Sequence, residues 1–447
     1  MKRFLGLGFV LFLYVFCTGC GDTFRPIIIP NPPTFPNPAA AHAVVSINDN
    51  GTVVVGTAMV IDVSGDTDVS VTNVGLAPVH AVQQSASQIL VVNHSVTGAL
   101  QDSITKLTFN GTVIFSASTI TLPPNSAPNF VATTEGTQAY VLLPNYTSVG
   151  VVNTATNSLV YTIPVGNNPV AMAETPDTKK LYVANHDDST ISGFNTLDRS
   201  SRTVNGSFSA PLWVTARSDS QRLYVLNGNG VVSTLDITST AGPDAVIDAS
   251  VNAPGAAYML YDGNKNRLYI PGGGQLTMLD VSQSVPAVLT GAPIAIPTVQ
   301  PTSRGAGDPC SGTSTAALNT IAVTALPDGT RAYVGSYYEN AVDNVNYVCP
   351  QVTVIDVASN AIKTYFAVPG FPAYDAFCAT TRFRLTMAAG GDSSRAYLAS
   401  CDGGMVNVID TSSDTYILNL PAPISSRTVQ GNPQNPPQNP VFLIPGP

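Results

Sequence analysis

The sequence predicts an all-β fold of small, similar sheets, and three observations lead to this prediction. Short apolar strands that contain tyrosine recur along the chain, and the spacings between Tyr140, Tyr182, Tyr224 and Tyr269 are 42, 42 and 45 residues. Most of these strands are followed by an apolar segment that ends in Asp or Asn before a polar turn. Charged residues make up only 11% of the chain, and residues typical of strands and turns take their place. An all-strand repeat of about 40–50 residues indicates a β-propeller.

The first 19 residues are predicted to be an export signal. Lys2 and Arg3 precede an apolar run of 13 residues, which is shorter than the roughly 20 residues that a membrane-spanning helix needs. The run ends in CTGC at residues 17–20, which resembles the lipobox of bacterial lipoproteins, although Cys17 stands where that motif most often has Leu. The resemblance implies cleavage before Cys20 and lipidation of its thiol. Ordinary secretion with an incidental Cys20 is the alternative.

Residues 20–41 are predicted to be a lipidated cysteine followed by a proline-rich tether. Six prolines between residues 26 and 38 block regular hydrogen bonding and favour an extended polyproline II chain. At ~3.1 Å per residue, this segment could hold a folded body roughly 60 Å from the membrane. We therefore expect a lipid anchor rather than a membrane-spanning segment, and a place in the bacterial cell envelope, either periplasmic or at the cell surface.

Residues 42–447 are expected to form a single propeller domain. Its clearest repeat is TIPVGNNPVAMAETPDTKKLYVAN at residues 162–185, with VVNTATN before it and STISGFNT after it, and this unit resembles the YVTN family of propeller repeats. The resemblance is looser elsewhere but extends from residue 43 to the C-terminus. It implies four antiparallel strands, A to D, which we place in this unit at residues 169–174, 181–185, 190–195 and near 202–208.

The Asp or Asn that ends each C strand is interpreted as a structural residue. Its side chain can accept hydrogen bonds from backbone amides two residues further on and so close the C–D hairpin. The residues at this position are Asn153, Asn195, Asp236, Asp280, Asp356 and Asp410.

The strand count favours eight blades. Seven A–B pairs are visible, but there are eight C–D hairpins. The unmatched hairpin comes first, at residues 59–71 after a B strand at 43–47, and the last residues supply a lone A strand at 441–444. Joining the two chain ends in one split blade would close the ring and leave no exposed strand edge. Seven blades, with the N-terminal segment packed alongside, is the alternative.

Four cysteines remain, and an even number in an exported chain suggests two disulfides. All four fall on the face of the B–C and D–A loops, where the long insertions at residues 296–317, 335–350 and 367–384 also lie. Cys310 and Cys349 would bracket one blade, and Cys378 and Cys401 would bracket the next. We predict these two pairs, each worth roughly 2–4 kcal/mol. Because none of the cysteines lies in a CxxC pair, a zinc site is not predicted.

The insertions are rich in aromatic residues, which suit a partner surface because a bound tyrosine loses little entropy. The candidate surface consists of Tyr337, Tyr338, Tyr347, Phe371 and Tyr374. The alternative is that these side chains fill a small core within the insertions themselves.

Candidate chemistry is otherwise sparse. The stretch NHDD offers His186, Asp187 and Asp188 side by side, but the repeat places it in a B–C loop, and we interpret it as a turn rather than a metal or hydrolase site. Among the seven visible A strands, His80 is the one residue whose unperturbed pKa lies near neutrality, and Arg384 is the one fixed charge. No catalytic residue, metal or cofactor is therefore predicted.

The sequence thus favours a non-catalytic binding or scaffold module that acts as a monomer, with an envelope protein or an extracellular ligand as its partner. The alternative is an enzyme with its site at the mouth of the central channel, such as a lactonase or a quinoprotein-like dehydrogenase, which YVTN propellers resemble in architecture. A net charge of −9, with only 19 Lys and Arg and no basic cluster beyond the N-terminus, argues against a nucleic-acid partner.

Overall fold

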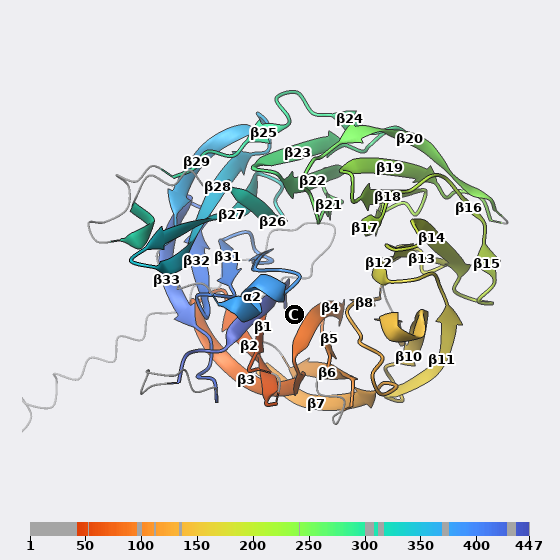
Figure 1. Cartoon of the computed structure of the whole chain (residues 1–447), viewed down its shortest axis with the longest axis horizontal. Coiled ribbons are helices and arrows are strands. Elements are labelled where there is room, and N and C mark those ends of the chain that lie inside the picture. The colour runs from red at the N-terminus through yellow and green to blue at the C-terminus, as the bar shows by residue number, and fades with distance from the viewer. Residues whose placement is uncertain are drawn as a thin grey trace, which may run out of the picture. The chain divides into compact units, whose positions relative to one another are not determined.

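The computed structural model describes ten stretches of the chain, all beyond residue 42. They are residues 43–51, 53–95, 101–110, 113–133, 136–240, 242–299, 308–311, 317–368, 375–426 and 435–446. Asn37–Pro447 form one compact unit, and the strands of this unit make eight sheets that surround a central axis (Figure 1). No helix within the described stretches has the length and apolar character that crossing a membrane requires.

Seven blades are each built from strands that follow one another in the chain, with the first strand innermost (Figure 1). The second blade contains β4 (Pro78–Ser85), β5 (Gln88–Asn93), β6 (Ser103–Asn110) and β7 (Val113–Thr121). The third contains β8 (Val131–Ala132), β9 (Gln138–Leu143), β10 (Ser148–Asn153) and β11 (Ser158–Pro164). The fourth contains β12 (Pro169–Glu174), β13 (Lys180–Asn185), β14 (Thr190–Asn195) and β15 (Ser201–Arg202), and its first three strands match the predicted A, B and C strands to within one residue.

The remaining blades keep this plan with additions. The fifth contains β17 (Pro211–Ala216), β18 (Arg222–Asn227), β19 (Val231–Asp236) and β20 (Asp244–Asn252), to which the short β16 (Val204–Asn205) adds in parallel. The sixth contains β21 (Leu260–Asp262), β22 (Arg267–Gly272), β23 (Gln275–Asp280), β24 (Ala287–Val288) and β25 (Ile294–Ala295). The seventh contains β26 (Asn319–Ala325), β27 (Arg331–Val342), β28 (Val345–Asp356) and β29 (Ala361–Ala367), and the eighth contains β30 (Leu385–Ala389), β31 (Arg395–Ser400), β32 (Met405–Asp410) and β33 (Thr415–Pro421).

The first blade joins the two ends of the chain, as predicted. Its strand order is β3 (Thr67–Leu76), β2 (Val55–Asp62), β1 (Ala43–Asp49) and β34 (Asn439–Pro445). The C-terminal strand β34 is antiparallel to β1, with Ile47 opposite Phe442. Every residue of β1 is buried. The closing blade therefore settles the count at eight and excludes the seven-blade alternative.

The periodic tyrosines lie buried in the second strands, and two of them donate hydrogen bonds to the neighbouring blade. Six of them are at most 1% exposed, namely Tyr140, Tyr182, Tyr224, Tyr269, Tyr333 and Tyr397. The Tyr182 hydroxyl donates to Asp244 of the fifth blade at 2.8 Å, and the Tyr333 hydroxyl donates to Asp414 of the eighth blade at 2.5 Å. At these two positions the repeated tyrosine stabilises the contact between consecutive sheets, and at all six it contributes a large buried side chain to the core.

The basic residue that opens several second strands also joins neighbouring blades. Arg267 Nη1 donates to the carbonyl oxygen of Val357 in the next blade at 2.8 Å. Arg395 Nε lies 2.9 Å from Asp66 Oδ2, and this ion pair connects the eighth blade to the first. Side-chain contacts therefore help to close the ring that β34 closes through the backbone.

The Asp and Asn residues at the C–D turns have the predicted structural role. Asp236 accepts a hydrogen bond from the backbone amide of Thr238 at 2.9 Å, and Asp410 accepts one from Ser412 at 2.7 Å. The bonds from the amide and hydroxyl of Thr238 hold the pKa of Asp236 below its usual range.

Candidate functional site

Six aromatic rings pack against one another at the inner ends of the blades. They come from six different blades and lie in a circuit, which we call the aromatic layer: His80, Phe130, Trp213, Tyr258, Phe383 and Phe442. The centroid separations around this circuit, in that order and back to His80, are 4.0, 5.4, 4.9, 6.1, 5.4 and 4.7 Å. Such separations are typical of favourable aromatic pairs. The layer therefore joins the inner ends of six blades through contacts between neighbouring rings.

The register of the inner strands explains why the rings meet. His80 lies opposite Val92, Trp213 opposite Leu226 and Phe442 opposite Ile47, and these are equivalent positions in three blades. Small residues occupy this position in two other blades, where Ala171 lies opposite Ala184 and Ala322 lies opposite Gly335. Phe383, which precedes β30, contributes its ring from outside a strand. Sequence reasoning missed the layer because it searched these strands for titratable groups only.

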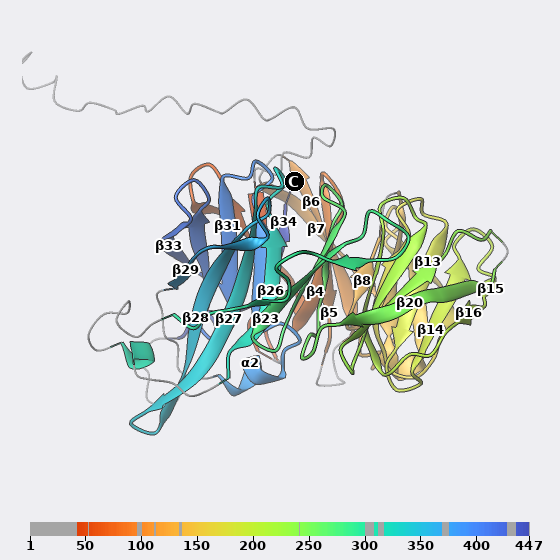
Figure 2. The same cartoon turned by 90° about the horizontal axis from the view of Figure 1, so that it is seen from above.

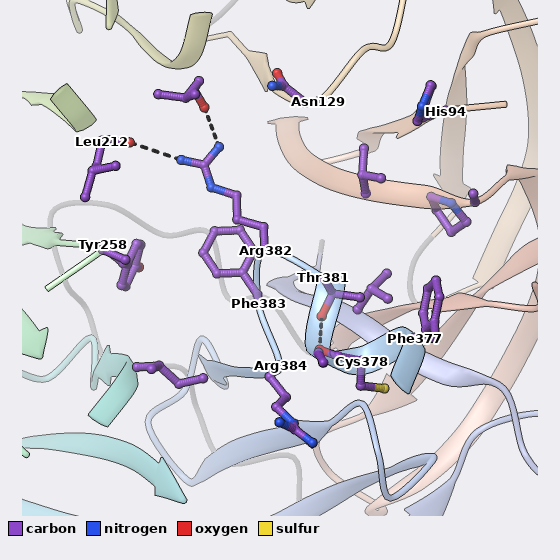
Figure 3. A pocket seen from close by; sticks show the side chains of 18 of the residues that line it. His94, Asn129, Leu212, Tyr258, Phe377, Cys378, Thr381, Arg382, Phe383 and Arg384 are labelled. Carbon is purple, nitrogen blue, oxygen red and sulfur yellow. Dashed lines mark hydrogen bonds between the residues drawn. The ribbon is translucent and has the colours of Figure 1, made fainter. Parts of the chain in front are cut away.

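A cavity of about 830 Å³ lies at the channel mouth, in contact with the aromatic layer through Tyr258 and Phe383 (Figure 3). Apolar side chains form most of its wall, including Val79, Val170, Leu212, Ile321 and Val441. Residues of the short helix α2 (Ala376–Thr380) contribute to one side. Of the described residues that line the cavity, two are arginines and none is a carboxylate.

Arg382 reaches from the eighth blade across the mouth to the opposite side of the ring (Figure 3). Its guanidinium donates to the carbonyl oxygens of Val170 in β12 and of Leu212 in β17, the latter at 3.2 Å. Its Cζ atom lies 5.4, 5.0 and 5.5 Å from the ring centroids of Phe130, Trp213 and Phe383. The Arg382 side chain is exposed, and although partial desolvation by the surrounding protein lowers its pKa to about 10, the group is a cation at neutral pH. No carboxylate in the described part of the chain forms an ion pair with it.

Arg384, which the sequence places at the channel as a fixed charge, is turned toward carboxylates instead. Its Nε and Nη2 atoms lie 2.7 and 2.8 Å from the two oxygens of Asp402, and Nη1 lies 2.9 Å from Glu339. The side chain is only 7% exposed. The charge that faces the cavity without a carboxylate is that of Arg382, which sequence reasoning missed because this residue lies in the insertion before β30.

His80 is a structural member of the aromatic layer. Its ring stacks on Phe130, and its Nδ1 accepts a hydrogen bond from the amide of Val131 at 3.3 Å. Burial is the main cause that lowers the pKa of His80 to about 3, and the positive charge of Arg382 adds to the effect. The imidazole is therefore neutral at physiological pH.

His94 lines the cavity beside a buried carboxylate. Its Nδ1 lies 3.2 Å from Asp102, which also accepts hydrogen bonds from the amide of Ser95 at 2.8 Å and from the hydroxyl of Ser126 at 3.0 Å. The fold thus brings together a Ser, a His and an Asp that the repeat pattern did not suggest. Because the hydroxyl donates to the carboxylate rather than to the imidazole, this is not the arrangement of a nucleophile and its base.

The NHDD stretch is held as a turn. Asp188 accepts hydrogen bonds from the amide and the side chain of Asn167 at 2.6 and 2.8 Å. Asp187 accepts one from Asn168 at 3.0 Å and lies 2.7 Å from His186 Nδ1. These bonds fix the loop to the strand connection beside it. Within the described stretches, no three His, Cys, Asp or Glu side chains gather as a metal site would require.

The two disulfides join the cysteines in the predicted pairs. Cys310 is bonded to Cys349, and Cys378 is bonded to Cys401. The extended hairpin of β27 and β28 and the helix α2 lie on the same face of the propeller (Figure 2). The first disulfide fastens the short helix η3 (Pro309–Ser311) to this hairpin, and the second fastens α2 to the turn after β31.

The aromatic residues of the predicted partner surface are not all exposed on one face. Tyr338 is 2% exposed, packs on the first disulfide and donates its hydroxyl hydrogen to the carbonyl of Cys310 at 2.7 Å. Tyr347 is half-buried against the same cluster, so these two residues fill the core of the insertion. Tyr337 lines the cavity, and the Arg384 guanidinium lies 5.1 Å from its ring centroid. Phe371 and Tyr374, like the predicted lipidation site Cys20, lie outside the described residues.

Replacing Cys378 and Cys401 together by alanine is expected to lower the free energy of unfolding by about 3 kcal/mol, because the disulfide closes a 23-residue loop. Denaturant unfolding measures the loss. Trp213 is the single tryptophan of the chain, so its emission also reports whether the aromatic layer beside α2 changes. Replacing Cys310 and Cys349 is the control, with a similar loss of stability but unchanged Trp213 emission. Equal effects of both pairs on the emission would contradict a link between α2 and the layer.

Comparison with known proteins supports the fold. No protein-family model matches the sequence, and no curated protein is similar to it, so the resemblance to YVTN repeats stays an expectation. Among solved structures, the chain is similar to dihydro-heme d1 dehydrogenase NirN in complex with DHE, with 13% identity, a TM-score of 0.57 and coverage of 88% of this chain and 76% of that one. It is also similar to apo AztD from Citrobacter koseri, with 12% identity and a TM-score of 0.55. The match covers 90% of this chain and 97% of AztD. A functionally unknown protein from Desulfotomaculum acetoxidans is similar with 10% identity and a TM-score of 0.50. The match covers 91% of this chain and 100% of that protein. At these identities the likeness concerns the propeller architecture alone.

Proposed function

We propose that the protein is a binding module that holds a small ligand in the cavity at the channel mouth. The observation that carries this proposal is a cavity of about 830 Å³ with apolar and aromatic walls and a cation that has no described carboxylate partner. Ligand sites in proteins are typically concave, mostly apolar and of roughly 300–1,000 Å³, with a few polar groups that orient the ligand. The disulfide beside α2 braces one wall of this cavity.

Binding without catalysis accounts best for the polar groups around the cavity. His94, the one imidazole among the described lining residues, is engaged with Asp102. The Thr381 hydroxyl donates to the carbonyl of Cys378 at 2.9 Å. General acid–base catalysis needs a group within hydrogen-bond reach of the reacting atoms and free to exchange a proton. The alternative function, a propeller enzyme, would have to draw on the other polar lining residues, Asn129, Tyr258 and Tyr337, and burial raises the pKa values of both tyrosines.

We further propose that the module works outside the cytoplasm, attached to a membrane through Cys20. The sequence supports this through the basic and apolar start of the chain, the lipobox-like CTGC and the proline-rich tether. The two disulfides agree with an oxidising compartment. Mass spectrometry of the protein purified from membranes tests the anchor, because a Cys20→Ser variant should lack the acyl mass and leave the membrane fraction.

The cavity can be tested with a neutral apolar probe. N-phenyl-1-naphthylamine added to the propeller unit, residues 37–447, is expected to bind saturably with one site and to quench Trp213 by energy transfer. Replacing Ala257, whose side chain lines the cavity, by phenylalanine should fill space and weaken binding by about tenfold or more, because lost apolar burial of this size is worth 1–3 kcal/mol.

Ala358→Phe is the matched control for this test. Ala358 lies on the exposed turn between β28 and β29, so the same substitution there adds the same side chain away from the cavity. Saturable binding that Ala257→Phe weakens and Ala358→Phe does not supports the proposal. Absence of saturable binding, or equal effects of the two variants, would overturn it.

A further inference from the structure

We infer that the cavity selects a monoanionic organic molecule with a flat apolar body, and that Arg382 binds its anionic group. This inference rests on the proposed function and adds the chemical class of the ligand. The group bound is a singly charged oxyanion such as a carboxylate or a sulfonate.

The charged residues around the cavity favour an anionic ligand. The chain carries a net charge of −9, yet the described residues that line the cavity include two arginines and no carboxylate. Arg384 is compensated by Asp402 and Glu339 behind the wall. Arg382 is held by backbone carbonyls and aromatic rings, which do not neutralise it. The guanidinium is exposed in the cavity and has no carboxylate beside it among the described residues, so an anion that enters the cavity can pair with it directly.

The geometry of Arg382 supports an oxyanion in particular. A guanidinium has five N–H donors in one plane, and two bonds to the carbonyls of Val170 and Leu212 occupy part of this set. These two bonds also fix the orientation of the group across the mouth. The donors that remain can pair with a carboxylate or sulfonate, for which the guanidinium is the best-matched side chain in proteins.

The surroundings of Arg382 define the rest of the ligand. The rings of Tyr258, Tyr337, Phe377 and Phe383 line the same cavity, together with aliphatic side chains of the inner strands. An aromatic or otherwise flat body can stack on these rings while its acidic group reaches the guanidinium. A second negative charge would lack a partner, because Arg384 already binds two carboxylates. A single charge on an apolar body therefore fits the site.

Two probes that differ by one anionic group test the inference. 1-Anilinonaphthalene-8-sulfonate has the body of N-phenyl-1-naphthylamine with a sulfonate added. We expect the propeller unit to bind the sulfonate at least about tenfold more tightly than the neutral probe, as energy transfer from Trp213 measures, since one hydrogen bond to a charged group contributes this much or more. Arg382→Met is expected to abolish this preference and to leave the Kd of the neutral probe within about threefold.

The matched control is Arg199→Met. The Arg199 guanidinium lies 3.6 Å from the Tyr161 ring centroid, on the turn between β14 and β15, so the substitution removes the same charge from an aromatic contact outside the cavity. It should leave the preference for the sulfonate unchanged. Retained binding of the neutral probe by Arg382→Met shows that this variant is folded. Arg382→Lys keeps the positive charge and should therefore keep part of the preference for the sulfonate probe.

The outcomes separate the two proposals. Equal binding of both probes by the wild-type protein, or an unchanged preference in Arg382→Met, would overturn the inference while the cavity remains a binding site. Loss of both probes in Arg382→Met with an intact melting transition would also overturn it, because Arg382 would then shape the cavity rather than select charge. Failure of both probes to bind the wild-type protein would instead overturn the proposed function.

Discussion

Replacing Asp244 by alanine is expected to lower the free energy of unfolding by about 3–5 kcal/mol, because it leaves a buried guanidinium without its counter-ion. Arg202 donates from Nε and Nη2 to the two oxygens of Asp244, at 2.8 Å each, and the two side chains are 1% and 0% exposed. Tyr182 of the preceding blade donates to the same carboxylate. The substitution thus removes the acceptor of three hydrogen bonds at the contact between two blades. Denaturant unfolding followed by circular dichroism measures the loss.

Two further variants define what the Asp244 result means. Tyr182→Phe should cost only about 1 kcal/mol, since it removes one hydrogen bond and leaves the ion pair intact. Lys179→Ala, which removes an exposed ion pair with Asp177 at 3.7 Å, should cost less than about 1 kcal/mol. A loss in the Asp244 variant no larger than that of Tyr182→Phe would show that the guanidinium finds water or another partner.

Deleting residues 439–447 is expected to abolish cooperative folding. The deletion removes β34, in which Val441, Leu443 and Ile444 are each 4% exposed. Burial of one such side chain contributes roughly 1.5–3 kcal/mol, so the three together contribute about 5–9 kcal/mol, which is comparable to the whole stability of a typical domain. The deletion also removes Phe442 from the aromatic layer and leaves β1 as an unpaired edge, which favours aggregation.

Circular dichroism melts and size-exclusion chromatography check the effect of this deletion. Removing only residues 446–447 is the control, with an expected loss of about 1 kcal/mol for the hydrogen bond from the Gly446 amide to Ala43 at 2.9 Å. A synthetic peptide of residues 435–447, added to the shortened chain during refolding, should restore part of the native spectrum. A shortened chain that melts cooperatively within a few degrees of the wild type would contradict the assigned role of β34.

Much of the fold could be predicted because each repeat contains the same residues at the same positions of its strands and turns. The Asp or Asn of a C–D turn accepts hydrogen bonds within its own hairpin, and a tyrosine recurs at the same place in most second strands, so the spacing of these residues alone reveals the unit. Once the strand order was assigned, the side of each loop followed, and with it the pairing of Cys310 with Cys349 and of Cys378 with Cys401.

The candidate site could not be predicted in the same way, because it depends on residues from many blades. The choice between Arg382 and Arg384 is decided by the position of Asp402, which follows a different strand. Tyr338 is buried because an insertion folds back on it, and no period in the sequence signals this. The aromatic layer was the accessible part, since an aromatic residue at one position of several inner strands is a pattern that can be counted.

The pairing of β1 with β34 has a consequence for how the protein folds. One side of β1 pairs with β2 in a local hairpin, but its other side is paired only by β34, from the far end of the propeller sequence. A folding intermediate in which β34 has not yet docked is therefore an open arc with a bare β edge, which a protease or another chain can bind. Docking of β34 thus ends the stage of folding in which the propeller is most vulnerable to proteolysis.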